Sequence, residues 1–371
     1  MSVLFISYPD LSKKNGGSIC TKVFIDIFQT LFSEVKLVIA KANNYAWDFS
    51  NYEIFEAPPT NQIERLGKIF CGVPHRYYSF LKNNEAILNN IDLVILSSSV
   101  LALGIAPLLE KKGIPFITIH HNYEPLYHRD NKTKISLWGK STQRIFRSED
   151  IALRKSFANI ALTKRDINTL IKKHNLDSNF KISCVPAILE SSFIKPELRT
   201  PIENKIVITG ALHDNQTEDG ILYFIRELLP ILEQIFPNAR VTVAGRNPSH
   251  KLKKVILLQK KIDLIENPDK MDEIVCNSML YINPTRLGSG LKLRNADAFK
   301  YGCPVLAQRN ACAGYENMLG KGLFQYNDKN DFRIAAEKYL TSKLSMKNIQ
   351  NSFFNNFSFS KNLDLIRTIV R

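Results

Sequence analysis

Several common signatures are missing from this sequence of 371 residues. Its six cysteines are scattered, without a C-x-x-C pair or a histidine at metal-ligand spacing, so neither a disulfide framework nor a zinc site is encoded. No G-x-G-x-x-G fingerprint occurs, which disfavours a dinucleotide cofactor. Residues 1–8 lack the basic segment and the apolar length of a secretory signal. We therefore expect a cytoplasmic protein that holds no metal and no cofactor.

The sequence also lacks a clear membrane-spanning run. The one stretch of nearly that length, Leu93 to Leu109, is interrupted by three consecutive serines and by Pro107. It falls short of the roughly 20 apolar residues that a spanning helix needs. A short buried strand over 93–96, a serine turn and a buried helix explain this stretch better.

Positive charge, by contrast, is in excess. The 50 Lys and Arg against 35 Asp and Glu leave a net charge of +15, and a hydrophobic content of 44% is ample for packed cores. A chain of this length suggests about two domains. Residues 131–181 alone hold 12 basic and 4 acidic side chains, a net of +8, and have the pattern of a basic amphipathic helix.

This basic segment has two interpretations, a solvated helix face or a contact with an anionic membrane surface. No motif of a nucleic-acid reader accompanies it, so we expect no nucleic-acid partner. The basic and apolar residues that alternate in its first part are Lys134, Ile135, Leu137, Trp138, Lys140, Arg144, Phe146 and Arg147.

Short apolar runs alternate with helical patterns along the chain, which predicts parallel sheets covered by helices on both faces. In the first half the expected strands are 3–7, 35–40, 93–97, 116–119 and 159–163, with helices near 18–32, 100–112 and 166–173. A second series of strands follows at 206–209, 240–244, 263–265, 279–282 and 304–307, with a helix over 220–236. A proline-containing linker lies near 190–203. We therefore predict two Rossmann-like domains, 1–195 and 196–350, and a closing helix over 351–371.

Ligands of doubly wound sheets bind beyond the carboxyl ends of the strands, so chemistry is expected in the loops there. In the first half, Gly16 and Gly17 precede a helix, a pattern that suits a bound anion but also an ordinary turn. After the strand at 116–119 come His120, His121 and Glu124. These side chains could act as acid and base, bind polyol hydroxyls or serve structure. A metal site would need a third ligand that the sequence does not show nearby.

The loop after the strand at 279–282 carries the most specific pattern in the sequence. Gly288 and Gly290 let the backbone close on a ligand, and a helix follows with Lys292 and Arg294 two residues apart and Asp297 further along. Free N–H groups and two cations would stabilise a diphosphate, and the carboxylate could accept hydrogen bonds from ribose hydroxyls. The alternative is a basic surface helix after a glycine turn.

This stretch resembles a known family signature. Its pattern, G-x-G-x-K-x-R-x-x-D-A-x-x-x-G-x-P-V from Gly288 to Val305, is similar to the G-x-G-x-R-x-K-x-x-E-A-x-x-x-G-x-P-V stretch of the retaining nucleotide-sugar glycosyltransferases of family 4. The run from Ile208 through Gly210 to Arg246 looks like the opening of the family's C-terminal domain. Residues 121–124 resemble the family's H-N-x-E loop, and the two glycines at 16 and 17 resemble its N-terminal loop.

The resemblance implies an α/β protein with the GT-B fold, in which two Rossmann-like doubly wound domains face each other across a cleft. Residues 1–195 would then bind the acceptor and residues 196–350 a nucleotide diphosphate sugar. The implied catalytic residues are His121, Lys292 and Arg294. The implied donor-binding residues are Gly210, Asn215, Arg246, Thr285, Arg286, Gly288, Ser289, Gly290, Leu291 and Asp297, and the implied acceptor-side residues are Gly16, Gly17, His120 and Glu124.

The implied activity is that of a hexosyltransferase that acts on a saccharide or lipid-linked acceptor in the biosynthesis of bacterial-type cell-surface polysaccharide or glycoconjugate. The expected mechanism is front-face substitution with retention, in which the leaving phosphate helps to deprotonate the acceptor and Lys292 and Arg294 stabilise the diphosphate. Metal-dependent transferases often use a D-x-D motif, and none occurs here, so we expect metal independence. With the basic segment, this predicts a cytoplasmic enzyme, peripheral on the inner face of the plasma membrane.

The sequence departs from the family pattern in several places. Asp297 replaces the usual Glu, the cations at 292 and 294 are exchanged, and Ser289 stands where some members have a Glu. The Arg and Lys that many members carry after the Gly210 strand are replaced by a polar stretch, His213, Asp214 and Asn215. A nucleotide-sugar epimerase of the same fold and a non-catalytic binding protein of this fold are the alternatives.

Overall fold

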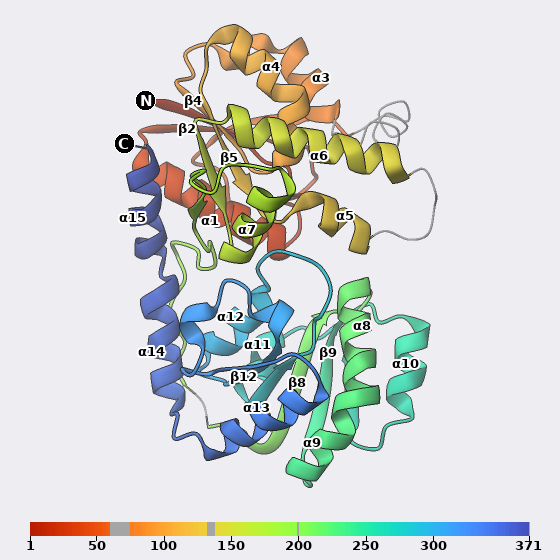
Figure 1. The fold of residues 1–371 in the computed structure, drawn as a ribbon. Coiled ribbons are helices and arrows are strands. Elements are labelled where there is room, and N and C mark those ends of the chain that lie inside the picture. The colour runs from red at the N-terminus through yellow and green to blue at the C-terminus, as the bar shows by residue number, and fades with distance from the viewer. Residues whose placement is uncertain (60–74, 132–137, 199, 371) are drawn as a thin grey trace. The chain divides into compact units, whose positions relative to one another are not determined.

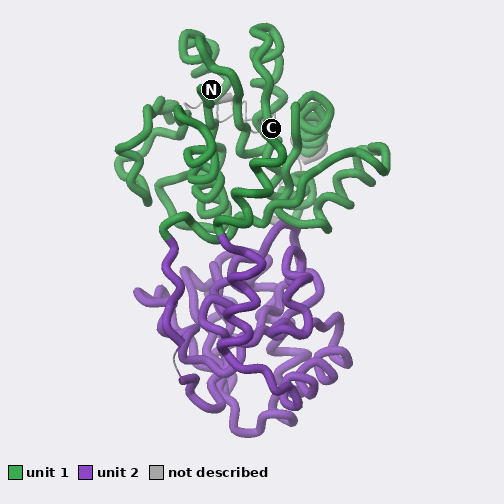
Figure 2. The backbone as a smooth tube through the Cα atoms, turned by 90° about the vertical axis from the view of Figure 1, so that its left-hand side faces the viewer, with its two compact units in different colours: residues 1–192, 359–371 green, residues 193–358 purple. Residues whose placement is uncertain are grey.

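The computed structural model describes residues 1–59, 75–131, 138–198 and 200–370, which form two compact units (Figures 1 and 2). Unit 1 comprises residues 1–192 and 359–371, and unit 2 comprises residues 193–358. The chain thus passes from unit 1 to unit 2 close to the predicted boundary at 195 and returns to unit 1 at its end. The segment predicted as one closing helix forms two, α14 (Met346–Phe357) in unit 2 and α15 (Phe359–Val370) in unit 1.

Unit 1 is built on a sheet of seven parallel strands in the order β3-β2-β1-β4-β5-β6-β7. All five strands predicted in this half are present, and β3 and β7 are additional. The strands are β1 (Ser2–Ile6), β2 (Glu34–Ala40), β3 (Glu53–Ala57), β4 (Leu93–Leu96), β5 (Phe116–His120), β6 (Ala158–Ala161) and β7 (Ser183–Cys184). The helices besides α15 are α1 (Gly16–Leu31), α3 (His75–Asn83), α4 (Ala102–Lys112), α5 (Glu124–Asn131), α6 (Trp138–Lys155) and α7 (Lys164–Lys173), with 3-10 turns η1 (Glu85–Leu88) and η2 (Ser99–Leu101).

Unit 2 has a sheet of six parallel strands in the order β10-β9-β8-β11-β12-β13. The five predicted strands are again present, and β13 is additional. The strands are β8 (Ile202–Ala211), β9 (Arg240–Arg246), β10 (Ile262–Glu266), β11 (Ser278–Asn283), β12 (Val305–Gln308) and β13 (Leu323–Tyr326). The helices besides α14 are α8 (Asn215–Tyr223), the π-helical turn η3 (Phe224–Leu228), α9 (Leu229–Ile235), α10 (His250–Leu257), α11 (Met271–Cys276), α12 (Leu293–Lys300) and α13 (Lys329–Thr341), with 3-10 turns η4 (Arg309–Cys312) and η5 (Glu316–Met318).

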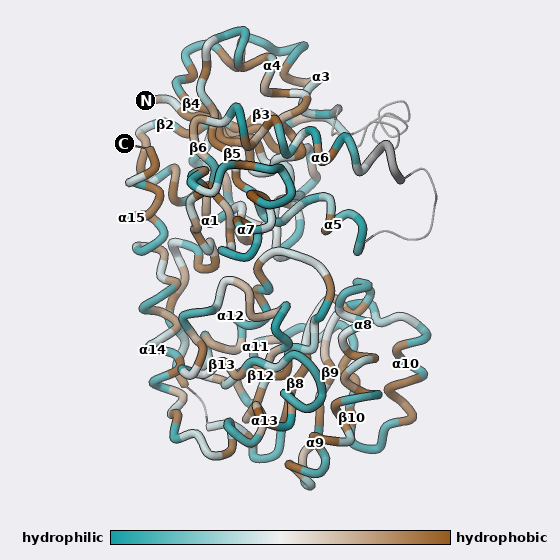
Figure 3. Tube along the Cα trace, in the orientation of Figure 1, coloured by the Kyte–Doolittle hydropathy of each residue, from teal (hydrophilic) through white to brown (hydrophobic). Residues whose placement is uncertain are grey.

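Each unit has its own hydrophobic core, formed where helices cover the sheet (Figure 3). The side chains of β1 from Val3 to Ile6 are completely buried, as expected for a central parallel strand covered on both faces. In unit 2, Ile208 of β8 and Phe224 of η3 belong to one buried cluster. Two independent cores explain why the chain forms two units rather than one.

The stretch at 93–109 folds as the sequence predicts. β4 is buried, Ser97 and Ser98 form a bend, η2 begins at Ser99, and α4 follows with Leu109 completely buried. No helix in the described ranges is long and apolar enough to cross a membrane.

The helix predicted over 220–236 is longer and less regular than expected. It begins at Asn215, five residues earlier, and contains the π-helical turn η3 between α8 and α9. Pro230 lies in the first turn of α9. Because proline lacks an N–H group and its ring clashes with the carbonyl group four residues earlier, the regular α-helical ladder is interrupted at this point.

Strand order reverses at one place in each sheet, between β1 and β4 in unit 1 and between β8 and β11 in unit 2. Loops that leave such neighbouring strands run to opposite sides, which opens a crevice at the carboxyl edge of the sheet. The loops after β1, β4, β8 and β11 are therefore the positions where the fold accommodates ligands.

The close contact between β8 and β9 leaves no room for a side chain at Gly245. A Cβ atom at Gly245 would overlap the carbonyl oxygen of Gly210 on the neighbouring strand. We expect Gly245→Ala to lower the free energy of unfolding of unit 2 by about 3 kcal/mol, the upper range for overpacking. Gly320→Ala is the control, because its φ of +71° is unfavourable for alanine but no atom lies within 4 Å of the added carbon. It should cost only about 1 kcal/mol. Thermal unfolding of both variants checks this, and equal losses would contradict the steric explanation.

Candidate functional site

The loop after β11 in unit 2 has the glycine-dependent geometry that the sequence predicts. Gly288 and Gly290 adopt φ values of +81° and +79°, which strongly favour glycine. A Cβ atom at Gly288 would overlap the side chain of Gln216, in the first turn of α8. The loop backbone therefore runs directly against the start of α8, which follows the neighbouring strand β8.

Lys292 and Arg294 lie where this loop enters α12. The Lys292 ammonium donates hydrogen bonds to Gln216 Oε1 at 3.0 Å and to the carbonyl oxygen of Ser289 at 2.8 Å. Arg294 donates to the hydroxyl of Thr217 at 3.0 Å and to that of Thr285 at 3.3 Å. The acceptors in these four hydrogen bonds are neutral oxygens, and they orient the two cations. An anion bound beside them would gain the attraction of both.

Gly210, at the end of β8, makes room for this arrangement. A Cβ atom there would lie 2.9 Å from the Thr217 side chain and 3.0 Å from the Arg294 guanidinium. α8 and α12 both start at this edge, and the first N–H groups of a helix have no partner within it. Two helix starts and two cations thus converge at the switch point of unit 2, an arrangement that favours a phosphate or diphosphate group.

The other predicted donor-side residues have different surroundings. Arg286 is exposed and forms a two-pronged ion pair with Asp219, at 2.7 and 2.9 Å, while its guanidinium lies over the Tyr223 ring. Asp297 follows Arg294 on α12 and pairs with Lys300 at 3.1 Å. The remaining predicted residues divide between buried and accessible positions: Thr285 and Ser289 are buried, Leu291 is half-buried, and Asn215 and Arg246 are exposed at the start of α8 and the end of β9.

Sequence reasoning missed the residues that orient the two cations. Gln216 and Thr217 contact Lys292 and Arg294, and two further side chains fix the loop itself: Asn310 donates to the Gly288 carbonyl at 3.0 Å, and the Tyr315 hydroxyl donates to the Lys292 carbonyl at 3.1 Å. The only signal in the sequence was that polar residues follow β8 at a helix start. Their contacts span 22 to 77 residues and depend on how the elements pack.

In unit 1, the loops after β1, β4 and β5 meet at the carboxyl edge of the sheet. The backbone N–H of Tyr8 donates to the Ser97 hydroxyl at 2.7 Å, which joins the first two loops. α1 begins at Gly16, capped by the Asn15 side chain. A Cβ atom at Gly17 would have only ordinary van der Waals contacts, so packing does not require glycine there.

The two neighbouring histidines have different positions. His120 ends β5, is completely buried and lies 3.0 Å from Asn159 on β6, so it is part of the unit's interior. His121 begins the following loop and is 7% exposed. Burial lowers the pKa of each ring to about 4, so both are neutral at physiological pH. A neutral His121 can accept as well as donate a hydrogen bond.

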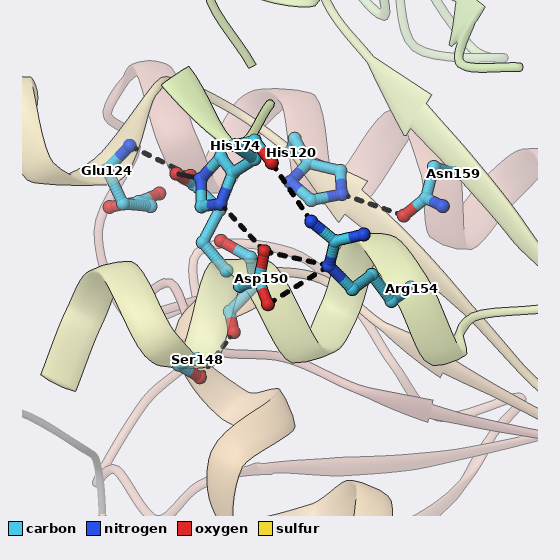
Figure 4. Close-up of polar contacts among 9 residues, drawn as sticks. His120, Glu124, Ser148, Asp150, Arg154, Asn159 and His174 are labelled. Carbon is cyan, nitrogen blue, oxygen red and sulfur yellow. Dashed lines mark hydrogen bonds and ion pairs between the residues drawn. The ribbon is translucent and has the colours of Figure 1, made fainter. Parts of the chain in front are cut away.

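A network of ionisable side chains, of which Glu149 and His174 are buried, lies next to this loop (Figure 4). His174, which follows α7, lies 2.9 Å from Glu149 and 3.2 Å from Asp150, both on α6. Glu149 Oε1 also accepts a hydrogen bond from the backbone N–H of Glu124 at 3.1 Å. Burial, with the nearby charge of Glu149, raises the pKa of Glu124 to about 8, so this carboxyl group is largely protonated at neutral pH.

Residues 203–342, which lie within unit 2, match the family model described as glycosyl transferases group 1. One curated relative, an uncharacterized 44.6 kDa protein in the cps region of Klebsiella pneumoniae, is 26% identical over 213 residues. That match covers 53% of each protein, so the chain spans about half the length of the curated relative.

Solved structures resemble the whole chain at low sequence identity. HepE of Anabaena in complex with UDP has a TM-score of 0.70 at 12% identity, covering 100% of this chain and 99% of that chain. Sucrose-phosphate synthase of Thermosynechococcus elongatus has a TM-score of 0.73 at 11% identity, with coverages of 100% and 98%. The lipopolysaccharide outer core galactosyltransferase WaaB, in its apo form, gives 0.65 at 12% identity, with coverages of 100% and 99%. The chain therefore has the GT-B fold of glycosyltransferases and contains a domain that matches glycosyl transferases group 1.

Proposed function

We propose that this protein is a glycosyltransferase that moves a sugar from a nucleotide diphosphate sugar to an acceptor hydroxyl. The observation that carries the proposal is the placement of Lys292 and Arg294 at the switch point of unit 2. Both cations face neutral acceptors and adjoin two helix starts and a glycine loop. The match of residues 203–342 to glycosyl transferases group 1 and the UDP bound in HepE support a nucleotide-sugar donor.

The geometry suits the departure of a nucleoside diphosphate. As the bond to the sugar breaks, negative charge grows on the leaving phosphate oxygens, and preorganised cations and N–H groups stabilise that charge most in the transition state. Gln216 and Thr217 hold the cations in place before the substrate arrives, which reduces the reorganisation needed during the reaction. In this proposal Asp297 binds the ribose and Gly288 and Gly290 allow close approach of the diphosphate.

We assign the enzyme to the retaining transferases of family 4, on the resemblance of the stretch from Gly288 to Val305. Retention by front-face substitution needs no nucleophilic carboxylate, because the leaving phosphate itself takes the proton of the acceptor hydroxyl. In this mechanism His121 of unit 1 contacts the donor sugar, and Gly16, Gly17 and Glu124 shape the acceptor side. The complete burial of His120 limits it to supporting the loop from within.

The acceptor in this proposal is a saccharide or a lipid-linked saccharide of cell-surface polysaccharide or glycoconjugate synthesis. The relative from the cps region and the similarity of fold to WaaB support this class of acceptor. The enzyme would act in the cytoplasm at the inner face of the plasma membrane. A nucleotide-sugar epimerase would use the same donor site but would release no nucleotide in response to an acceptor, and a non-catalytic binding protein would release none at all.

Removal of either cation tests the leaving-group role. Lys292→Ala and Arg294→Ala should each raise the barrier by about 2 to 4 kcal/mol, or lower kcat by about 30- to 1,000-fold, since each removes a preorganised stabilising group. The measurement is acceptor-dependent release of nucleoside diphosphate from a panel of nucleotide sugars. Lys254→Ala is the matched control, because this exposed lysine of α10 lies outside the site. Turnover close to that of the control in both variants would refute the assignment.

The proposed reaction needs no divalent metal, because protein cations hold the diphosphate. Turnover measured with excess EDTA should stay within about twofold of turnover without chelator, since a twofold change is only about 0.4 kcal/mol in the barrier. Loss of activity with EDTA that Mg²⁺ or Mn²⁺ restores would instead show that a metal ion holds the diphosphate.

Attachment to the membrane is assigned to the exposed face of α6. Arg144 and Arg147 are exposed there, whereas Arg154 pairs with Asp150 on the same helix, and Lys155 pairs with Glu110. The side chains of Trp138 and Lys140 are not described, and Lys134, Ile135 and Leu137 lie outside the described residues.

Binding to liposomes tests this assignment. Each basic residue near an anionic leaflet contributes about 1 kcal/mol, so Arg144→Glu with Arg147→Glu should reduce sedimentation with anionic liposomes by at least about tenfold. Higher salt should release the wild-type protein as well. The control is Lys254→Glu with Lys338→Glu, which changes the net charge equally on exposed positions of unit 2. Equal binding of both double variants would remove the membrane role.

A further inference from the structure

Two consecutive residues of α6 hold the starts of two different helices. The Ser148 hydroxyl accepts a hydrogen bond from the N–H of Leu103, in the first turn of α4, at 2.9 Å and donates one to the carbonyl of Ser99 at 2.7 Å. The Glu149 carboxylate accepts from the N–H of Glu124, the first residue of α5. These helices follow the loops after β4 and β5, so α6 fixes the far end of each loop.

His174 in turn holds Glu149. Its ring is stacked on Phe146, with centroids 4.1 Å apart and planes 8° from parallel, and Tyr123 contacts it edge-on. Carboxylates of Glu149 and Asp150 face its two nitrogens, at 2.9 and 3.2 Å, so the ring is fixed on both sides.

Arg154 closes the network. It donates to the carbonyl of His174 at 2.9 Å and to both carboxylate oxygens of Asp150, at 3.1 and 3.2 Å. Asp150 is thereby held in place against the second nitrogen of the ring (Figure 4).

A contribution to the stability of unit 1 does not by itself explain why these ionisable groups are buried. Glu149 is completely buried, and burial raises its pKa while the contacts from His174 and Glu124 oppose this rise. Removing charged groups from water costs several kcal/mol per ion, and well-packed apolar residues are often at least as stabilising. What apolar residues would not supply is an acceptor for the Glu124 N–H, and with it a fixed position for the short loop from His121 to Glu124.

We propose that Glu149 and His174 are positioning residues that hold the loop of residues 121–124 so that His121 is presented at the carboxyl end of β5. Glu149 acts through the backbone of Glu124, and His174 acts through Glu149. Neither residue touches substrate. The use that the enzyme makes of His121 rests on the proposed function, whereas the placement of its ring can be measured without any substrate.

Titration of His121 is the direct test. In protein labelled with ¹⁵N in its histidine rings, NMR should give His121 its lowered pKa of about 4 in the wild type. Glu149→Ala removes the acceptor for Glu124, so the loop should loosen and the pKa of His121 should move toward its ordinary value of about 6.5. His120, anchored to Asn159 inside the unit, should keep a pKa of about 4 in every variant and serves as the internal reference.

Two further variants distinguish a specific effect on the position of the loop from a general loss of stability of unit 1. Glu149→Gln keeps an amide oxygen that can accept from Glu124, so it should restore most of the wild-type titration. Leu109→Ala opens a cavity in the core of α4 and should cost about 2 to 5 kcal/mol of stability while leaving His121 at its wild-type pKa. A shift of His121 in Leu109→Ala as large as that in Glu149→Ala, or none in Glu149→Ala, would overturn the proposal.

Kinetics provide a second readout. Glu149→Ala should lower kcat at least about tenfold, because small displacements of groups at the reacting centre are costly. The Kd for UDP, used as a probe of the donor site proposed in unit 2, should stay within twofold. His174→Gln fills similar space without a second ring donor and should show the same split if Glu149→Ala does not fold. Wild-type kcat in both variants would overturn the proposal. Failure of the wild-type protein to turn over any nucleotide sugar of the panel would reject the proposed function alone, because the titration of His121 still decides the positioning role.

Discussion

Parallel pairing is the constraint on which the other features of this molecule depend. Every strand pair in the described part of both sheets is parallel, so each strand delivers its carboxyl end to the same edge of its sheet. Two parallel neighbours need a crossover connection of about a dozen residues or more, usually a helix, and these helices cover both faces of the sheet. The starts of those helices then gather at the edge where the loops lie. The candidate site residues of both units therefore lie at sheet edges that the topology brings together.

The basic side chains described above have different partners in the two units. In unit 2, Lys292 and Arg294 are held by amide, carbonyl and hydroxyl oxygens, so their positive charge stays effective toward a bound anion. In unit 1, His174 and Arg154 contact carboxylates within the protein, and Glu149 and Arg154 also contact backbone groups. Basic side chains thus contact neutral oxygens in unit 2 and carboxylates in unit 1.

The sequence was sufficient to predict the parts of the structure that depend on local pattern. The alternation of apolar runs located ten strands, and Gly288 and Gly290 marked the loop because their backbone conformation strongly favours glycine. The strands β3, β7 and β13 were missed, since β3 carries Glu53 and Glu56 among its five residues, β7 has only two residues, and Gln325 interrupts β13.

Contacts between elements that are distant in the sequence could not be predicted from it. Gln216 contacts Lys292 across 76 residues, and Glu149 contacts the N–H of Glu124 across 25. Nothing in the local pattern of either segment specifies such a partner. Similarly, two adjacent histidines gave no indication that one would be interior and the other would begin a loop. That difference follows from the point at which β5 ends.

Because α6 contacts the starts of both α4 and α5, insertions and deletions within α6 are restricted. Successive residues of an α-helix point about 100° apart, so Ser148 and Glu149 can reach α4 and α5 at the same time only in one rotational setting of α6. Inserting or deleting a single residue of α6 before Ser148 would rotate Ser148 and Glu149 by about 100° relative to the preceding turns. Both side chains would then lose their contacts with α4 and α5. Tolerated changes in length are therefore expected outside the ordered turns of α6, and a library of single-residue insertions across unit 1 should be depleted within this helix even at its solvent-exposed positions.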